Sequence, residues 1–393
     1  MSACDRRPAL FLTGHAPPDR IGAFAALHER ERIEVALYGG RLRHGSSGGG
    51  LELPFPHRMI SQRSALPLAA SRRYRAVICS LGGRLALPAG WAGARCARTP
   101  LILWSALWSH PRSAAHLLSY APLARLYRSA DALVTYGPHV SAYVRARGAR
   151  NVHEAPQAVD NAFWSAPATA PPESPRWPAQ SAVKFLYVGR LEREKGIEVL
   201  LSAWRAAALS APSAALIVAG SGSLSALVAA AEHASHSRPA EGAQGAAVVA
   251  LGPVSAPELR NLYAAADVLV LPSLPTRTFR EPWGLVVNEA FNQGVPVIAT
   301  DAVGAVAGGL VRSRRNGLIV RSASASALAY AIRELAHDEA LRKRLGVAAR
   351  ADVASYTYEA WAEGFSAALA SLGRSLRCGR DAGSVARGAH GLL

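Results

Sequence analysis

Short apolar runs alternate with longer amphipathic segments along almost the whole chain. The apolar runs have the length of buried strands, and the segments between them have the spacing of helices that cover a sheet. A parallel sheet accommodates this order, because each strand is connected to the next through a helix. Few other folds remain open to such a sequence, and the pattern predicts an α/β protein.

The alternation runs twice, on either side of a proline-rich stretch. At 393 residues the chain is too long for one typical domain. We predict Rossmann-like domains over 1–165 and 181–355, a linker over 166–180, a last amphipathic helix over 356–372, and a basic, disordered tail over 373–393. A glycine- and serine-rich loop is expected at Gly45–Gly50.

The predicted strands can be read directly from the apolar runs. In the first domain they are Ala9–Thr13, Ile33–Tyr38, Ala76–Ser80, Leu101–Trp104 and Ala132–Thr135. In the second domain they are Lys184–Val188, Ala215–Ala219, Val248–Leu251, Val268–Leu271 and Val295–Ala299.

Composition limits the class of protein. No apolar run reaches the ~18–20 residues that cross a bilayer. The apolar residues near the N-terminus are cut short by Gly14–Pro18, so we read them as a first strand rather than a signal peptide. The four cysteines are scattered without metal-ligand spacing, and we expect a reduced, cytoplasmic protein with no bound metal.

The positive charge is concentrated in the first half. Residues 1–170 hold 21 arginines and nine acidic residues, whereas 171–393 hold 23 basic and 18 acidic residues. Such an excess attracts an anionic partner, unless it is a compositional bias on a solvated face. No nucleic-acid-binding motif is present, so an anionic membrane surface or a phosphorylated lipid fits better.

The stretch 280–290 places two glutamates around a turn and a helix start. Glu281 precedes Pro282-Trp283-Gly284, and Glu289 follows eight residues later, roughly 12 Å along a helix at ~1.5 Å per residue. The helix N-terminus offers unpaired N–H groups to a phosphate. Each carboxylate is suited to a polyol, so the stretch fits a nucleoside diphosphate sugar. A surface glutamate beside a capping turn is the alternative.

A second candidate cluster follows strand Lys184–Val188. Gly189, Arg190 and Lys195 stand at a strand end, where ligands of doubly wound sheets bind. Arg190 and Lys195 are suited to hold a diphosphate. Lysine is rare in this chain, which has three among 44 basic residues, so its use here indicates a specific need. A solvated helix start with i,i+4 charge pairs explains the same residues equally well.

Together these motifs resemble a known family. Five segments match in order and spacing: Gly189–Gly196, Val218–Gly222, Ala265–Ser273, Glu281–Glu289 and Gly294–Thr300. They are similar to the retaining glycosyltransferases of family 4, the "glycosyl transferases group 1" type, over about residues 182–320. The resemblance implies the GT-B fold, in which two Rossmann-like domains with parallel sheets face a central cleft. It also implies donor binding on the second domain and acceptor binding on the first.

The resemblance assigns a role to each matching position. Arg190 and Lys195 would bind the donor diphosphate, Glu281 the transferred sugar and Glu289 the ribose. The remaining donor-binding positions are Gly189, Gly220, Gly222, Pro253, Val254, Trp283, Gly284, Leu285 and Val286. No cofactor is implied beyond the nucleotide diphosphate sugar as co-substrate, and no Asp-x-Asp motif is present, which agrees with metal independence.

The first half resembles the family less. Gly14 and His15 follow the first strand, where the family often has a glycine-rich loop, and a double glycine is missing. His110 follows a later strand and is a candidate catalytic residue, although a histidine beside Trp108 and Pro111 is as often a packing residue. Asp160 ends a stretch in which Gln157 or Ala158 replaces the usual asparagine.

One further surface is suggested by the sequence. Its members are Trp104, Trp108, Tyr120, Tyr127, Arg112, Arg125 and Arg128. They would form an acceptor or membrane-contacting surface, or else belong to a helix packed on the sheet with exposed arginines.

We therefore expect a retaining hexosyltransferase that uses a nucleotide diphosphate sugar. Its acceptor would be a glycan, a lipid or a small molecule, and it would act in the cytoplasm or at the inner membrane surface. Two alternatives remain, a sugar-nucleotide epimerase of the same fold and a non-catalytic partner subunit that binds the nucleotide. Donor turnover without an acceptor would identify the first, and binding without turnover the second.

Overall fold

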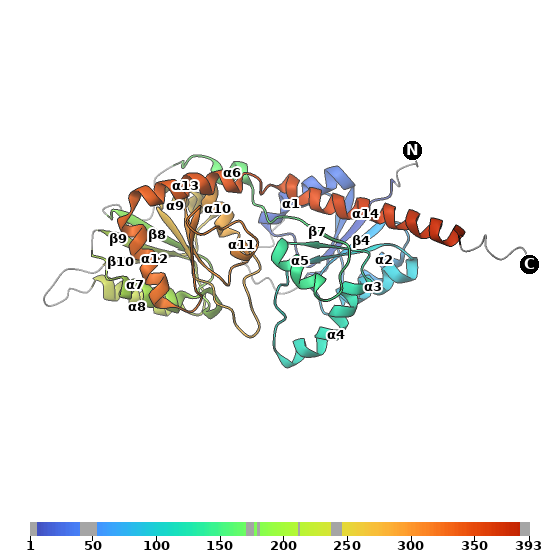
Figure 1. The fold of residues 1–393 in the computed structure, drawn as a ribbon, viewed down its shortest axis with the longest axis horizontal. Helices are drawn as coiled ribbons and strands as arrows, with labels where there is room; N and C mark the ends of the chain where they lie inside the picture. The colour runs from blue at the N-terminus through green and yellow to red at the C-terminus, as the bar shows by residue number, and fades with distance from the viewer. Residues whose placement is uncertain are drawn as a thin grey trace, which may run out of the picture. The chain divides into compact units, whose positions relative to one another are not determined.

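A computed structural model describes residues 6–39, 53–169, 177–178, 181–210, 213–236 and 246–385. The chain divides into two compact units (Figure 1). Unit 1 comprises residues 1–108, 114–158 and 357–393, and unit 2 comprises 109–113 and 159–356. Each unit is an α/β body built on one parallel sheet, so the α/β prediction is confirmed.

Unit 1 contains a seven-stranded sheet in the order β3-β2-β1-β4-β5-β6-β7. Its strands are β1 (Ala9–Thr13), β2 (Ile33–Leu37), β3 (His57–Met59), β4 (Ala76–Ser80), β5 (Leu101–Ser105), β6 (Ala132–Thr135) and β7 (Val152–Glu154). The five predicted strands are present. Edge strands β3 and β7 were not predicted, because each has only three residues, two of them with charged or imidazole side chains, and so shows no apolar run.

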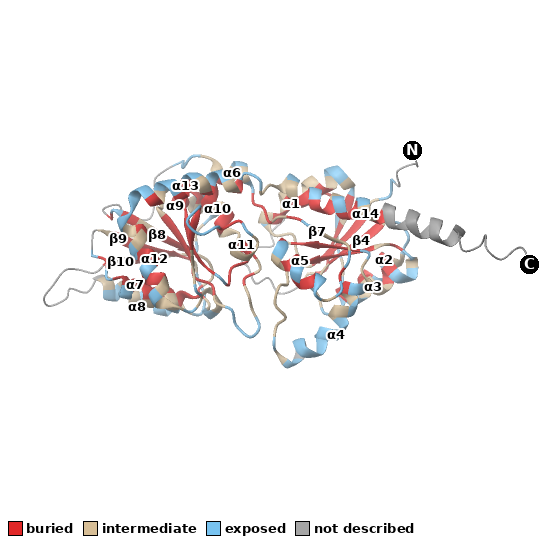
Figure 2. Ribbon diagram, in the orientation of Figure 1, coloured by how far each residue is buried: buried red, intermediate tan, exposed pale blue. Residues whose placement is uncertain are grey.

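Helices cover both faces of this sheet. They are α1 (Pro18–Glu31), α2 (Ala65–Ala70), α3 (Ala86–Ala97), α4 (Ala114–Ser129), α5 (Pro138–Arg145) and α14 (Tyr358–Val385). Successive β1 residues point to opposite faces, so Phe11 joins one apolar cluster while Leu10 and Leu12 join the other. Figure 2 shows the strands as buried between these two layers.

The C-terminal helix α14 belongs to unit 1. Trp361 and Phe365 on α14 are fully buried, and their rings meet Phe24 of α1 and Phe11 of β1. A Cβ on Gly364 would overlap the Glu154 carbonyl, so this glycine permits the close approach of α14 to β7. The helix extends to Val385, past the helix end predicted at residue 372, and residues 386–393 lie outside the described part.

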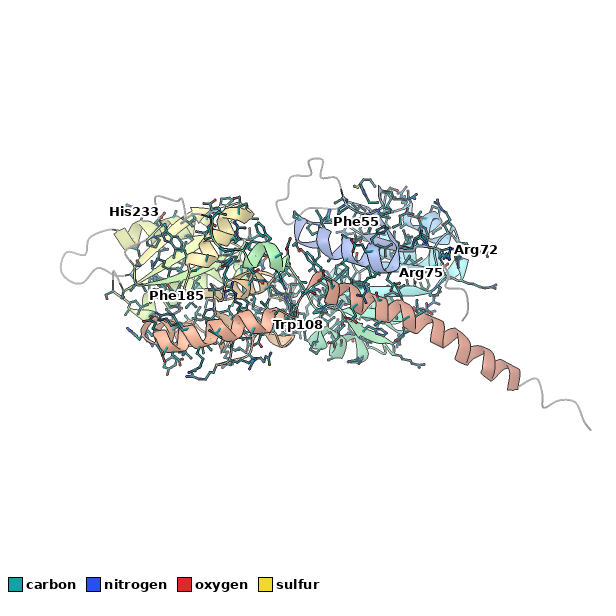
Figure 3. All side chains as sticks on the ribbon, turned by 90° about the horizontal axis from the view of Figure 1, so that it is seen from above. Phe55, Arg72, Arg75, Trp108, Phe185 and His233 are labelled. Carbon is teal, nitrogen blue, oxygen red and sulfur yellow. The ribbon has the colours of Figure 1, made fainter. Side chains whose placement is uncertain are left out.

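Unit 2 contains a six-stranded sheet in the order β10-β9-β8-β11-β12-β13. Its strands are β8 (Val183–Val188), β9 (Ala214–Ala219), β10 (Ala247–Gly252), β11 (Val268–Leu271), β12 (Val297–Thr300) and β13 (Gly317–Val320). Phe185 in β8 has no exposed surface and packs against Trp204 (Figure 3). The five predicted strands are present, and the edge strand β13 is the addition.

The helices of unit 2 agree closely with the sequence pattern. They are α6 (Asn161–Ser165), the 3₁₀ turn η1 (Arg193–Lys195), α7 (Ile197–Ala207), α8 (Ser225–His236), α9 (Ala256–Ala265), α10 (Val286–Asn292), α11 (Gly304–Ala307), α12 (Ala325–His337) and α13 (Glu339–Val353). Ser255, Ser324 and Asp338 cap α9, α12 and α13 through their side-chain oxygens, which fixes where these helices begin.

The structure places the start of unit 2 at Val159, earlier than the predicted linker. Asn161 in α6 accepts a hydrogen bond from Asn292 of α10 at 2.9 Å, which ties α6 to unit 2. Most of the predicted linker and the whole Gly45–Gly50 loop lie outside the described residues. Within the described part of the chain, no helix is both long and apolar enough to span a bilayer.

Candidate functional site

The predicted site residues of unit 2 follow the carboxyl ends of neighbouring strands. Arg190 and Lys195 follow β8, Gly220 follows β9, and Glu281 lies in the loop after β11. The strand order β10-β9-β8-β11 therefore brings these loops side by side. This is the edge at which doubly wound sheets bind their ligands.

Three of the predicted glycines hold the loops against one another. Gly220 donates to Gly252 O at 2.7 Å, and a Cβ at Gly220 would overlap the Gly189 carbonyl. A Cβ at Gly222 would lie 2.6 Å from Leu191 O. Gly189 and Gly220 also have φ of 152° and 144°, which side chains rarely adopt. Glycine is thus required here by the protein's own backbone, whether or not a ligand approaches.

The turn after β10 lies beside Gly220. Gly252 has φ of 74° and accepts the Gly220 bond, and the chain then continues through Pro253 and Val254. Pro253 is exposed and Val254 is half-buried. Their surfaces are therefore accessible at the same edge of the sheet as the glycine loops.

Lys195 and Glu281 are joined directly. The Lys195 ammonium donates to Glu281 Oε2, which also accepts from Ser273 Oγ at 3.0 Å. The lysine side chain is 14% exposed and the glutamate side chain 8%. Thr300 Oγ1 donates to Ser273 O at 2.5 Å and so supports the residue that orients Glu281. An ion pair this shielded from water needs such extra hydrogen bonds to offset desolvation.

Arg190 is only partly engaged by the protein. Its Nη2 donates to Glu194 Oε1 at 2.9 Å, which is the i,i+4 pair considered from the sequence. Its Nε is buried and has no hydrogen-bond partner among the described residues. Tyr187 donates its hydroxyl to Arg190 O at 2.7 Å and fixes the backbone. Arg190 therefore retains donor capacity at this edge.

The turn 282–286 positions the start of α10. Gly284 has φ of 94°, and a Cβ there would lie 2.8 Å from Leu271 Cδ2. Trp283 is 3% exposed, donates its Nε1 to Asn288 Oδ1 at 2.8 Å and packs against the tilted ring of Tyr356. The structure thus gives the Trp283 side chain a packing position. The half-buried Leu285 and Val286 begin α10, as the sequence predicts.

Glu289 lies in the first turn of α10 and is half-buried. Tyr263 of α9 donates its hydroxyl to Glu289 Oε2 at 2.8 Å. Complete burial raises the pKa of Tyr263 well above its ordinary value, and the negative charge of Glu289 raises it further. The phenol therefore remains a hydrogen-bond donor and holds the carboxylate in place.

Three predicted residues lie away from these loops in sequence. His110 is half-buried in the segment 109–113, which belongs to unit 2, where Arg112 N donates to Arg277 O at 2.6 Å. Gly14 and His15 follow β1 in unit 1, and both are half-buried. A Cβ at Gly14 would make only ordinary contacts at 3.6 Å, so packing does not require glycine there.

Residues 175–352 match the family model described as "Glycosyl transferases group 1". This range contains all the site residues of unit 2 described above except His110. The second domain is thus similar to this family over most of its length, and we refer to residues 175–352 as the group 1 domain. The match extends beyond residues 182–320, the range inferred from the motifs.

Curated relatives match less than half of the chain. A D-inositol 3-phosphate glycosyltransferase of Pseudarthrobacter chlorophenolicus is 36% identical over 168 residues, 42% of this chain and 37% of that protein. An uncharacterized glycosyltransferase of Methanocaldococcus jannaschii is 31% identical over 169 residues, 43% of this chain and 40% of that protein. The chain thus aligns with about two fifths of these relatives' length.

Solved structures match nearly the whole chain in fold. Anabaena HepE in complex with UDP and glucose has a TM-score of 0.68 at 20% identity, covering 93% of this chain and 100% of that one. Sucrose-phosphate synthase from Thermosynechococcus elongatus has a TM-score of 0.67 at 21% identity, covering 95% and 100%. The predicted GT-B fold, two Rossmann-like domains, is therefore confirmed.

Sequence reasoning did not single out the residues that support the group 1 site. Ser273 holds Glu281 and Tyr263 of α9 holds Glu289. A hydroxyl residue two positions after the end of β11 was the available signal for Ser273.

In unit 1 the structure reveals a buried arginine that the sequence did not indicate. Arg20 is 7% exposed, donates to Gln157 Oε1 and lies over the rings of Trp104 and Tyr136. Gln157 thus has a packing role. Asp160 accepts from Phe163 N at 2.9 Å and caps α6.

Proposed function

We propose that the protein is a glycosyltransferase of family 4 type that moves a hexose from a nucleoside diphosphate sugar to an acceptor with retention of configuration. The observation that carries the proposal is the Lys195–Glu281 pair beside Arg190, at the carboxyl edge of the group 1 domain. A cation for a diphosphate and a carboxylate for a sugar are already in contact. The acceptor, a glycan, lipid or small molecule, is proposed to bind the first domain.

The proposed chemistry follows from these groups. When the bond from the anomeric carbon to the β-phosphate oxygen breaks, negative charge builds on the phosphate. Arg190 and Lys195 are suited to stabilise that charge in place of a metal ion, aided by the N–H groups of Gly284, Leu285 and Val286. The acceptor oxygen bonds the anomeric carbon on the same face, and the leaving phosphate takes the acceptor proton.

The choice of sugar donor is supported by one of the similar solved structures. HepE is described in complex with UDP-glucose, so this donor is the first to test. Glu289, held by Tyr263, is proposed to bind the ribose hydroxyls, and Glu281 the transferred sugar. No cofactor is proposed beyond the co-substrate. A role in polysaccharide or glycolipid biosynthesis in the cytoplasm fits this chemistry.

Replacing Lys195 by alanine should weaken binding of a nucleoside diphosphate by about 10-fold or more, because a charge-assisted hydrogen bond contributes about 1.5–3 kcal/mol. Calorimetric titration of UDP into the full chain measures this. Lys343→Ala is the matched control, since Lys343 is 76% exposed and pairs with Glu339 on α13. If the wild type and Lys195→Ala bind UDP with equal affinity, Lys195 does not belong to the donor site. A separate assay tests the epimerase alternative, which turnover of UDP-glucose by the wild type without an acceptor would favour.

We also propose that α4 contacts an anionic membrane. Leu117, Leu118 and Tyr120 on its first turns are 62%, 81% and 43% exposed. Arg112, Arg125 and Arg128 are exposed along the same segment, and residues 109–129 contain no acidic residue. Apolar side chains flanked by arginines suit the lipid interface.

Replacing both Leu117 and Leu118 by serine should weaken binding to phosphatidylglycerol vesicles in a flotation assay by about 100-fold or more, because each buried leucine contributes about 1.5–3 kcal/mol. The control is Val347→Ser on α13, where valine is 75% exposed. Wild-type binding that is absent, or unaffected by salt, would contradict the proposal, since the arginines act through screened charge.

A further inference from the structure

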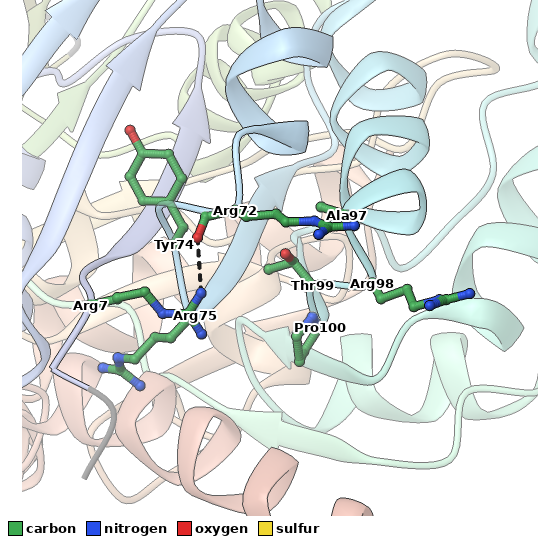
Figure 4. Close-up of a pocket in the computed structure, with 8 residues that line it drawn as sticks. All are labelled: Arg7, Arg72, Tyr74, Arg75, Ala97, Arg98, Thr99 and Pro100. Atoms are coloured by element: carbon green, nitrogen blue, oxygen red, sulfur yellow. Dashed lines mark hydrogen bonds between the residues drawn. The ribbon is translucent and has the colours of Figure 1, made fainter. Parts of the chain in front are cut away.

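Unit 1 has a cationic pocket at the edge of its sheet where the strands begin. Arg75 N donates to Pro8 O at 3.0 Å and Val77 N to Pro100 O at 2.9 Å, which joins the starts of β1, β4 and β5. The pocket measures about 320 Å³, and four arginines and Thr99 contribute to its lining (Figure 4). It lies at the opposite end of the strands from their carboxyl ends, so it is separate from the edge at which this fold class binds nucleotides.

The four arginines are Arg7, Arg72, Arg75 and Arg98. Arg72 and Arg75 lie close together in Figure 3. In Figure 4 the guanidinium of Arg7 lies below the carbonyl of Arg72, and the bond between them is 2.9 Å. The side chain of Arg72 runs toward Ala97, whereas that of Arg98 extends outward at the rim.

The acidic residues nearby already have partners in the protein, and Glu34, which lies beside Tyr74, pairs with Arg58. Glu31 accepts from Arg75 Nη2 at 2.6 Å, so it neutralises that arginine. Asp131 accepts from Leu101 N at 2.8 Å and lies 3.9 Å from Arg95 Nη2. Among the residues that the structure describes, no ion pair forms with Arg72 or Arg98. Arg72 and Arg98 therefore bring positive charge to the pocket that no described carboxylate pairs with, and the carbonyl ends of α2 and α3 at this edge offset only part of it.

Two of these arginines occupy backbone positions that favour glycine. Arg72 and Arg98 follow the ends of α2 and α3 with φ of 57° and 55°. Glycine adopts this left-handed conformation without a steric cost, and an arginine there stores strain. Strained residues gather where a side chain has a task beyond folding.

We propose that this pocket binds a phosphate-bearing anion, a phosphomonoester or a diphosphate, separately from the sugar-nucleotide site. The positive charge of Arg72 and Arg98 attracts an anion. The planar guanidinium group of Arg72 can direct two N–H groups at phosphate oxygens, and the Thr99 hydroxyl adds a donor from the buried floor. A free phosphate compound and the headgroup of phosphatidic acid both present this chemistry.

The test uses the double variant Arg72→Gly/Arg98→Gly. It removes both unpaired guanidinium groups and relieves the strained backbone, so the fold should be as stable as the wild type or more stable. Arg32→Gly is the matched control, because Arg32 has φ of 52° after α1 and does not line the pocket. Pyrophosphate is titrated by calorimetry into the full chain carrying Lys195→Ala, so that the proposed donor site contributes little. A second arm measures flotation with vesicles containing phosphatidic acid.

We expect the double variant to bind about 10-fold more weakly in at least one arm, and Arg32→Gly to bind as the parent does. Loss in the pyrophosphate arm identifies a soluble ligand, and loss confined to the vesicle arm identifies a lipid headgroup. Unchanged binding in both arms, or an equal loss with Arg32→Gly, would overturn the proposal and leave the arginines as solvated helix ends. Both arms measure binding alone, so their results do not depend on whether the protein transfers a sugar.

Discussion

Replacing Glu281 by alanine is expected to reduce sugar transfer by about 100-fold or more, because the carboxylate would lose its hydrogen bonds to the transferred sugar. The substitution also leaves the largely buried Lys195 ammonium without its partner, at a cost of about 3 kcal/mol in the free energy of unfolding. Single-turnover release of UDP from UDP-glucose measures the activity, and urea unfolding measures the stability.

Two variants separate these effects. Glu281→Gln keeps the side-chain shape and an acceptor for Ser273 Oγ, so it should remain folded while transfer falls. Glu339→Ala removes a glutamate, 65% exposed, from an i,i+4 pair on the surface, and should leave both stability and activity as in the wild type. Transfer by Glu281→Gln and Glu281→Ala at the wild-type rate would exclude Glu281 from the reaction.

Trp361→Ala should produce the largest loss of stability, about 3–5 kcal/mol, because it opens a cavity between α14 and the first sheet. Trp361 has no exposed surface, and its ring lies 4.4 Å from that of Phe365 and 5.7 Å from those of Phe24 and Trp104, centroid to centroid. Urea unfolding followed by circular dichroism measures the loss. Limited proteolysis should then cleave within α14 before it cleaves elsewhere.

The controls follow from the same contacts. The Trp361 Nε1 is buried with no hydrogen-bond partner among the described residues, so Trp361→Phe sacrifices no bond and should cost only about 1 kcal/mol. Tyr330→Ala on α12, where the tyrosine is 66% exposed, should change stability by less than about 0.5 kcal/mol. A loss for Trp361→Ala no larger than that for Tyr330→Ala would show that α14 is not anchored through this ring.

The candidate site was partly visible in the sequence because its motifs are local. Gly189 to Gly196 and Glu281 to Glu289 each fall within one loop and the element that follows it, so their chemistry and spacing can be read directly. The contact between Lys195 and Glu281 joins residues 86 positions apart. It depends on β8 and β11 being neighbours, which no local pattern specifies.

The tertiary structure also changed the explanation of several residues. Trp283 reads as a ligand-facing aromatic in its turn, yet its ring is buried against Tyr356. The sequence analysis placed Gly220 among the residues that bind the nucleotide sugar. The structure shows that the backbone of Gly189 already excludes a side chain at this position. The positions of Trp283 and Gly220 depend on which segments pack against each other. The sequence of one segment does not specify the segment that packs against it.

The sequence by itself determined the two parallel α/β units and their central strands, and it supplied the candidate site residues. The central strands are buried on both faces, so they appear in the sequence as apolar runs. Only the tertiary structure decided the short edge strands, the pairing of Lys195 with Glu281, and the meeting of Arg72 and Arg98 at one pocket. These features come from strand order and helix ends, which bring together side chains that share no local signal.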